Sequence, residues 1–153
     1  MAIGSVLTNS FKTELLKGFH SFDTSGATPA GSVFKIALYN SSADLTTTTT
    51  AYTTTEELAT ATGYTRPGNT LTNTGVGIST VTSYTDFSDV SWTSASFTAR
   101  GCMIYNSSSI SGLTSNACVC TIDFGGDKTV SSGTFTIQFP ANDSSNAIIR
   151  ITS

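Results

Sequence analysis

Residues able to carry hydrolytic chemistry are few and widely spaced in this chain. A Ser-His-Asp site needs a histidine held beside a nucleophile, but the only histidine, His20, lies just after Phe19 in no supporting motif, and we expect it to be structural or solvated. Glycoside hydrolysis needs two carboxylates on separate elements, whereas Glu56 and Glu57 are adjacent and would point to opposite faces of an extended chain. The sequence contains no nucleophile elbow, phosphate-binding loop, dinucleotide fingerprint or zinc-protease motif. It therefore predicts no catalytic residue and a protein that is not an enzyme.

Residue types that hold metal ions also lack a suitable spacing. Four aspartates near predicted strand ends have the oxygen ligands that Ca²⁺ prefers, but they match no calcium-binding loop, and we expect them to cap turns: Asp86, Asp89, Asp123 and Asp127. The three cysteines are Cys102, Cys118 and Cys120. A C-x-C pair with one further cysteine and a remote histidine is poor zinc-site spacing. We expect reduced thiols, no metal site and no cofactor.

The elements that must position any site are strands, because hydroxyl and aromatic residues dominate the composition. The chain of 153 residues has 29 Thr and 23 Ser, against seven Lys and Arg and ten Asp and Glu, with nine Phe, five Tyr and 13 Gly. Threonine is branched at Cβ and suits the pleated, half-exposed face of a sheet. Frequent glycine indicates many turns. These features predict an all-β fold of one domain's length.

Apolar residues alternate with polar ones from Val33 onward. Within 33–39, Phe34, Ile36 and Leu38 share one face, which predicts a strand with one buried face. The tract 41–55 contains five consecutive threonines and no alternation, which predicts an exposed loop or edge. A Gly-Gly-Asp turn is expected to close a strand at 125–127. Further strands are predicted at 70–71, 76–81, 84–92, 97–105, 117–124, 134–139 and 147–151.

The order of these strands indicates the architecture. Turn signals separate them throughout the chain, and nowhere do strand and helix alternate as they would in a parallel sheet. We therefore predict an antiparallel two-sheet sandwich, jelly-roll-like, with one short N-terminal helix. A closed barrel is the alternative architecture.

The N-terminal segment departs from the strand pattern. Leu7, Phe11, Leu15 and Phe19 recur every four residues, which predicts a helix over 8–17 with one apolar stripe. Residues 1–20 would form a helical arm, 21–32 a linker and 33–153 the β-sandwich domain. Two placements are open for the stripe. It closes one end of its own sandwich, or it packs on a neighbouring subunit, which makes these four residues candidate assembly contacts.

Charge and hydropathy limit the partners and the location. The formal net charge is −3 and the basic residues are scattered, so no basic stripe exists to follow a nucleic-acid backbone. No apolar run approaches the roughly 20 residues that span a bilayer. Residues 1–11 have neither the positive nor the apolar region of a signal peptide. We expect a protein used without secretion, with no nucleic-acid and no membrane partner.

Several stretches of the chain are distinctive when taken together. They are LTNSFKTELL (7–16), FKIALYNSS (34–42), YTTTEELATATGYTRPGNT (52–70), DFSDVSWTSASFTARGCMIYNS (86–107), 123–140 and NAIIRI (146–151). They resemble a family of small virion proteins of tailed phages, notably short-tailed phages of cyanobacteria, almost from end to end. The resemblance implies a trimeric capsid cement, or decoration, protein with a β-sandwich fold. Such a protein is made in the host cytoplasm and binds the major capsid protein lattice on the outer capsid surface.

A second function follows from the same resemblance. Similar sandwiches occur at the tips of tail spikes, which implies a module of a spike, fibre or capsid surface that recognises host-surface glycans. Aromatic rings that stack on sugars would carry this function. The candidate rings are Tyr52, Tyr64, Tyr84 and Trp92, of which we expect Trp92 to lie in the core.

Overall fold

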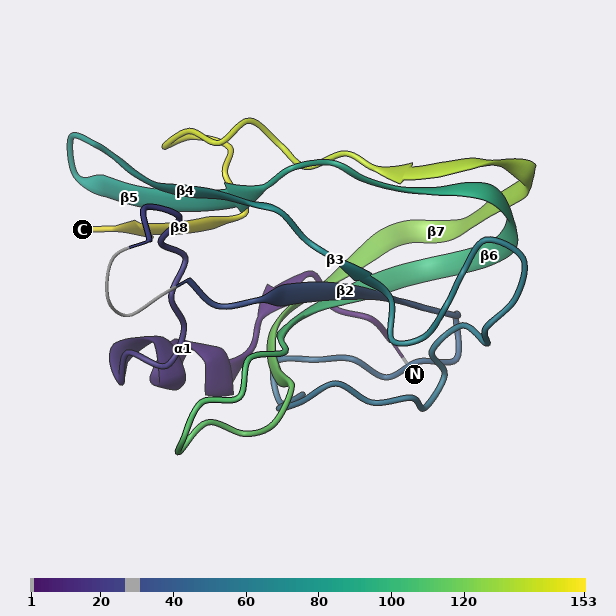
Figure 1. Ribbon diagram of the computed structural model, residues 1–153, viewed down its shortest axis with the longest axis horizontal. Coiled ribbons are helices and arrows are strands. Elements are labelled where there is room, and N and C mark those ends of the chain that lie inside the picture. The colour runs from purple at the N-terminus through teal and green to yellow at the C-terminus, as the bar shows by residue number, and fades with distance from the viewer. Residues whose placement is uncertain (1, 27–30) are drawn as a thin grey trace.

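Two antiparallel β-sheets and one short helix form the part of the chain that the computed structural model describes, residues 2–26 and 31–153. The elements are β1 (Val6–Leu7), α1 (Asn9–Leu16), β2 (Phe34–Tyr39), β3 (Asn69–Thr70), β4 (Asn73–Ser79), β5 (Thr82–Phe87), β6 (Val90–Asn106), β7 (Ala117–Ile137) and β8 (Ile149–Thr152). Strand order is β1-β7-β6-β2-β3 in the five-stranded sheet and β4-β5-β8 in the three-stranded sheet (Figure 1). No described helix is long and apolar enough to cross a bilayer. The expected antiparallel two-sheet fold with a short N-terminal helix is confirmed.

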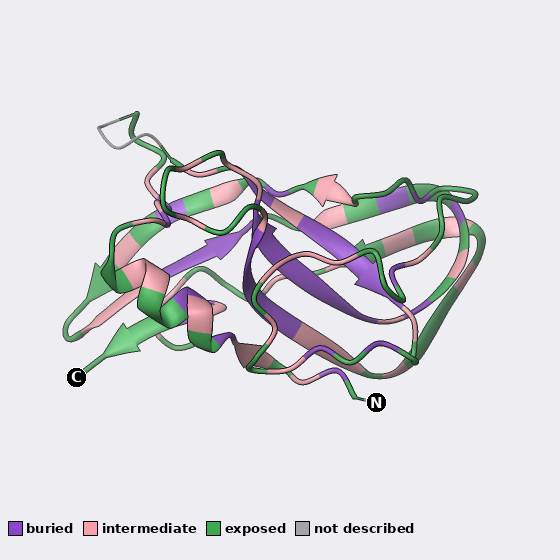
Figure 2. Cartoon of the chain, turned by 90° about the horizontal axis from the view of Figure 1, so that it is seen from below, coloured by how far each residue is buried: buried purple, intermediate pink, exposed green. Residues whose placement is uncertain are grey.

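The main hydrophobic core lies between the two sheets. Ile36 and Leu38 of β2 and Ile104 of β6 are fully buried in it, and Phe87 of β5 and Ile149 of β8 enter it from the smaller sheet. Figure 2 shows the buried residues concentrated in the central strands, whereas β8 is mostly exposed. The apolar residues whose alternation predicts these strands are thus the residues that fill the core.

A second apolar cluster covers the outer face of the five-stranded sheet, where the sequence predicted solvent. Ala37 and Tyr39 are buried as completely as their neighbours on the inner face, so β2 has two buried faces and not one. The tract 41–55 provides the cover, because Ala43 and Leu45 are buried against this face. The expectation of an exposed tract is therefore wrong for its first part. Two apolar residues are too few to produce a recognisable alternation.

Strands β6 and β7 form one long two-stranded ribbon, which the sequence divided into shorter strands. Figure 1 shows the ribbon leaving the lower layer and bending so that its far end lies at the level of the smaller sheet. The prediction of a turn at 125–127 is wrong. These residues stay within β7, where they form a bulge between Asp123 and Lys128. Gly125 adopts a φ of 73°, in the left-handed region that glycine enters without strain. The glycines here bend a strand and do not reverse the chain.

The single strand predicted over 84–92 is two strands of different sheets. β5 ends at Phe87 and β6 begins at Val90, so the chain crosses between the sheets at Ser88 and Asp89. The Asp89 carboxylate accepts a hydrogen bond from a backbone amide of the segment after β7, which holds the crossing. Phe87 and Val90 are three positions apart, so the period of two breaks at the crossing, a signal that the prediction of one strand overlooked.

Helix α1 begins and ends close to the predicted residues. Thr8 is the N-cap, and its hydroxyl accepts a hydrogen bond from the amide of Phe11 (3.3 Å). Gly18 follows the C-cap with a φ of 77°, a conformation that ends helices readily in glycine. Two residues before the helix form β1, an unpredicted strand that pairs with β7, and α1 also packs on β7. The N-terminal segment therefore lies against its own sandwich.

The expected linker, 21–32, lies partly outside the described residues, which exclude 27–30. Its described ends meet, since the amide of Ser32 donates to the carbonyl of Ser21 over 2.8 Å. Phe22 belongs to the main core, where its ring stacks on that of Phe34 with centroids 4.5 Å apart. The first residues after α1 are thus packed on the sandwich.

Candidate functional site

The predicted apolar stripe lies against the chain's own sandwich, and three of its four residues reach the core. Phe11 is 0% exposed and fully inside it, and Leu7 and Leu15 pack against it. The ring of Phe19 lies against Gly112 of the loop between β6 and β7. Two placements were open for the helix, and in the structure it packs on the sandwich of its own chain. Contact of the exposed parts of Leu7, Leu15 and Phe19 with another subunit stays a prediction.

An apolar groove lies between the N-terminal segment and the inner face of the three-stranded sheet. Its volume is about 340 Å³. Leu15 and Phe22 line it on one side, and Val76, Thr85 and Ile149 line it on the other. The three sheet residues are direct cross-strand neighbours on β4, β5 and β8, so they share one face. The groove is open because α1 covers only part of this face.

Large aliphatic side chains remain exposed on α1 and on the smaller sheet, and two of them, Val76 and Ile151, line this groove. We call them the aliphatic rim, and they are Leu16 of α1, Val76 and Ile78 of β4, Val81 of the following turn and Ile151 of β8. Ile78 is 73% exposed and Ile151 is 58% exposed, and both flank Ser83 on the inner face. In the described chain only one other large apolar residue, Val33, is comparably exposed. Alternation in the sequence indicates that such residues share a face, but not that the face is left uncovered.

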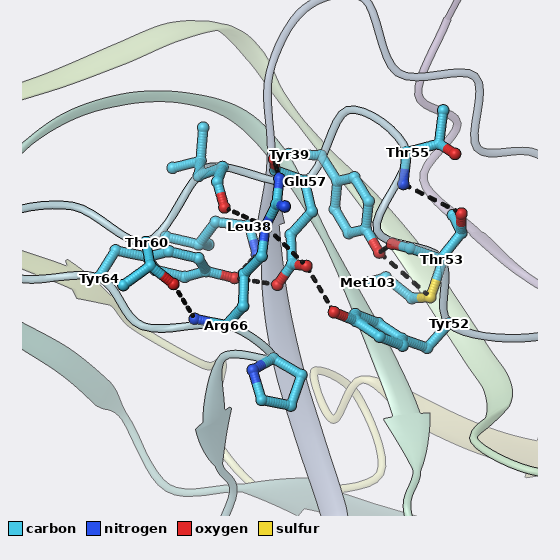
Figure 3. A network of polar contacts seen from close by, with 12 residues as sticks. Leu38, Tyr39, Tyr52, Thr53, Thr55, Glu57, Thr60, Tyr64, Arg66 and Met103 are labelled. Atoms are coloured by element: carbon cyan, nitrogen blue, oxygen red, sulfur yellow. Dashed lines mark hydrogen bonds and ion pairs between the residues drawn. The ribbon is translucent and has the colours of Figure 1, made fainter.

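A buried carboxylate, Glu57, lies in the loop between β2 and β3, where its backbone is bridged to Tyr39 at the end of β2. Glu57 is 2% exposed, and its oxygens accept hydrogen bonds from the hydroxyls of Tyr52 (2.5 Å) and Tyr64 (2.7 Å). The Arg66 guanidinium forms an ion pair with it at 3.3 Å. The Tyr64 hydroxyl also accepts a bond from the amide of Leu38 (3.0 Å), which ties the cluster to the sheet (Figure 3). The cluster anchors the loop before β3.

This cluster is a structural brace and not a reactive centre. The Glu57 side chain is completely enclosed, and both of its oxygens already accept bonds from the chain. Burial raises the pKa of Tyr64, and the adjacent Glu57 carboxylate acts in the same direction. Burial and Glu57 also raise the pKa of Tyr52. Both phenols therefore stay neutral and keep donating.

His20 is buried as well and has both ring nitrogens engaged. Its Nε2 lies 3.0 Å from Oε2 of Glu14, and its Nδ1 lies 3.1 Å from Nδ2 of Asn106. The side chain is 0% exposed. Among the described residues the ring is bonded to Glu14 and Asn106, so His20 links the helix to the end of β6.

The aspartates considered as calcium ligands lie in separate places. Asp86 is buried and accepts hydrogen bonds from two backbone amides, and burial raises its pKa. Asp123 pairs with Arg100 at 2.8 Å, and Asp89 accepts a bond from the amide of Phe139. Within residues 2–26 and 31–153, no three His, Cys, Asp or Glu side chains gather to hold a metal ion.

The cysteines are free and buried. Cys118 belongs to the outer cluster, whereas Cys102 and Cys120 belong to the main core. The pairing of β7 with β6 shifts at Val119, which puts the two members of the C-x-C pair on different faces. Burial raises the pKa of all three thiols, that of Cys120 to about 12. They stay protonated, and a thiol is a poor nucleophile.

We expect an alkylating reagent to leave the folded protein unmodified and to label three cysteines after denaturation. The reason is that the reactive thiolate is suppressed and the sulfur atoms are enclosed. Mass spectrometry of the protein treated before and after unfolding in denaturant counts the labels. Rapid labelling of the native protein, or a disulfide in protein alkylated at lysis, would contradict the expectation.

The groove and its aliphatic rim form the best candidate site in the described chain, because the polar clusters are enclosed. No protein-family model, curated protein or solved structure matches the chain. The function is therefore argued from this site and from the resemblance noted in the sequence. The groove is mostly apolar, although Ser21, Asp23 and Ser83 also line it, and exposed apolar surface of this kind is typical of protein contact.

The aromatic residues considered for sugar stacking are distributed over several places. Tyr64 and Trp92 are buried, which confirms the core position expected of Trp92. Tyr52 is half-buried, with its hydroxyl bonded in the Glu57 cluster. The ring of Tyr84 lies beside Gly77 of β4, and the residue contributes to the lining of the groove. In the described residues these four rings therefore do not form a common stacking surface.

Proposed function

We propose that this chain is a structural protein of a phage virion, a homotrimeric cement protein that binds the major capsid protein lattice on the outer capsid surface. The observation that carries the proposal is the aliphatic rim, five large aliphatic side chains exposed on α1 and the smaller sheet, two of which line the groove. Exposed apolar patches are typical of protein–protein contact. The resemblance to phage virion proteins supplies the class of assembly.

A second copy of the chain is the occupant that we assign to the groove. Permanent homo-oligomer interfaces are the most apolar class of interface, and the rim residues carry no charge. The strands β4 and β8 are both edges of the smaller sheet. Symmetric association is one way in which proteins cover such edges. The remaining polar surface of the trimer would then face the capsid.

Many weak contacts suffice for a cement protein. A trimer presents three identical patches, which engage a symmetric lattice together. Such avidity can exceed single-contact affinity by about 10²–10⁴ without any new contact. A rigid two-sheet fold without reactive groups meets this requirement, because the protein needs only to hold its patches at a fixed spacing.

Particles stripped of the protein are expected to burst at a lower temperature than decorated particles, and adding the protein back should restore their stability. The protein should bind expanded shells and not soluble capsid subunits, because only the lattice presents several sites at the matching spacing. Calorimetry of both kinds of particle measures the difference. Quantitative mass spectrometry of the particles gives the copy number.

Matched variants test the groove in the same experiment. Ile78→Ser combined with Ile151→Ser should stay folded, run as a monomer in light scattering and rebind shells about 10²-fold more weakly through lost avidity. Val33→Ser, which changes an equally apolar exposed residue away from the groove, should behave as the unmodified protein. Equal heat resistance of stripped and decorated particles, together with different adsorption to host cells, would replace the cement function by recognition of host glycans.

A further inference from the structure

A buried corner of the fold joins the N-terminal segment to the loop between β6 and β7 through His20. The ring is 0% exposed and lies edge-on to Phe11, with centroids 4.9 Å apart. Nε2 is 3.0 Å from Oε2 of Glu14 on α1, and Nδ1 is 3.1 Å from Nδ2 of Asn106, the last residue of β6. One side chain therefore connects three segments of the chain.

The amide of Asn106 determines which tautomer His20 adopts. Oδ1 of Asn106 accepts a hydrogen bond from the backbone amide of Ser108 (3.0 Å). Its amino group therefore faces His20, and an amino group can only donate. Nδ1 must then accept, and Nε2 carries the proton that is donated to Glu14. The observed arrangement is complete only for the neutral ring.

A second proton on His20 has no acceptor in this corner. Protonated Nδ1 and the Asn106 amino group would be two donors facing each other, and Asn106 could turn its oxygen to the ring only by releasing the amide of Ser108. Ser108 lies near the start of the loop 107–116. The loop is further held by the amide of Ser107, which donates to the carbonyl of Val33 (2.8 Å).

The charges around the ring do not remove this conflict. Glu14 of α1 favours the protonated ring, but burial acts more strongly and lowers the pKa of His20 from 6.5. Asp23, on the segment after the helix, lines the same groove and accepts bonds from its own loop. Cys118 of β7 is a neutral thiol, and Asn106 of β6 is uncharged. The stability contributed by neutral His20 is thus fully present above about pH 6.5 and is lost as the pH falls through the lowered pKa.

We propose that His20, Glu14 and Asn106 form an acid-sensitive latch, in which protonation of His20 releases the loop 107–116 from the segment that follows α1. The released contacts are the Ser108 amide bond to Asn106 and the packing of Phe19 on Gly112. This latch is independent of the proposed function, because it depends only on contacts within one chain.

The test follows His20 and the Ser108 amide in the unmodified protein between about pH 8 and about pH 5. Nuclear magnetic resonance titrates the ring, and hydrogen exchange, corrected for the intrinsic effect of pH, reports the amide. The hydrogen-exchange rate of the Ser108 amide should rise about tenfold as His20 becomes protonated. The exchange rates of amides in the central strands should change less. Protonation of His20 with unchanged exchange at Ser108 would overturn the proposal.

Asn106→Asp is the matched variant. An aspartate keeps the oxygen that accepts from Ser108 and replaces the amino donor with an acceptor for protonated Nδ1. His20 should then titrate at higher pH than in the unmodified protein, and acid should no longer accelerate exchange at Ser108. A variant as acid-sensitive as the unmodified protein would contradict the latch. If the variant does not fold, the titration of the unmodified protein decides alone.

Discussion

Replacing Phe11 with alanine is expected to lower the free energy of unfolding by about 3–5 kcal/mol. The ring is 0% exposed and lies in the main core, where it contacts Phe22 with centroids 6.2 Å apart and His20. Truncation leaves a cavity between α1 and the sandwich that the surrounding strands cannot fill. Urea denaturation followed by circular dichroism measures the change.

Leu16→Ala is the control on the same helix. Leu16 is 90% exposed, so its truncation should change the free energy of unfolding by no more than about 0.5 kcal/mol. Equal effects of the two substitutions would mean that α1 does not dock on its own chain in solution, and that the stripe is available to a neighbouring subunit. The comparison separates the two placements that the sequence left open.

Glu57→Ala is expected to destabilise the fold by about 1–3 kcal/mol, the range for leaving a buried polar group without its hydrogen-bond partner. The substitution leaves the Tyr64 hydroxyl without its acceptor, whereas the partly exposed Arg66 guanidinium loses the ion pair but still donates to the backbone carbonyls of Glu57 and Leu58. Tyr64 is 1% exposed, so water cannot replace the lost carboxylate. The loss should appear as a lower midpoint of urea denaturation.

The adjacent residue provides the matched control for this substitution. Glu56 is exposed, and its carboxylate accepts one hydrogen bond from Asn40 at the surface. Glu56→Ala should therefore change stability by no more than about 0.5 kcal/mol. A similar loss for both positions would contradict the stabilising role of the buried cluster.

The parts of the fold that could be predicted are those whose signal is local. Leu7, Phe11 and Leu15 recur with a helical period next to a capping threonine, and Phe34, Ile36 and Leu38 alternate with a strand period. Each pattern reports one element and one buried face. The helix and the two-sheet architecture follow from such patterns alone.

The parts that could not be predicted depend on distant segments. The cover of the outer face by Ala43 and Leu45, and the bulge at Gly125, are visible only when the partner strands are in place. The Glu57 and His20 clusters likewise join residues that no local period relates. For the candidate site, alternation indicated a face on β4 and β8, but only the three-dimensional arrangement shows that α1 leaves it partly uncovered.

The attachment of the N-terminal segment to β7 has a consequence for the order in which the protein folds during translation. The Thr8 hydroxyl donates to the carbonyl of Cys118 over 2.8 Å, across a separation of 110 positions. At roughly 5–20 residues per second, the ribosome needs about 5–20 s to make the partner strand after the helix has emerged. During that time the ring of Phe11 has no core to enter and is accessible to chaperones. The earlier-made segment is therefore packed after most of the sandwich has been synthesised.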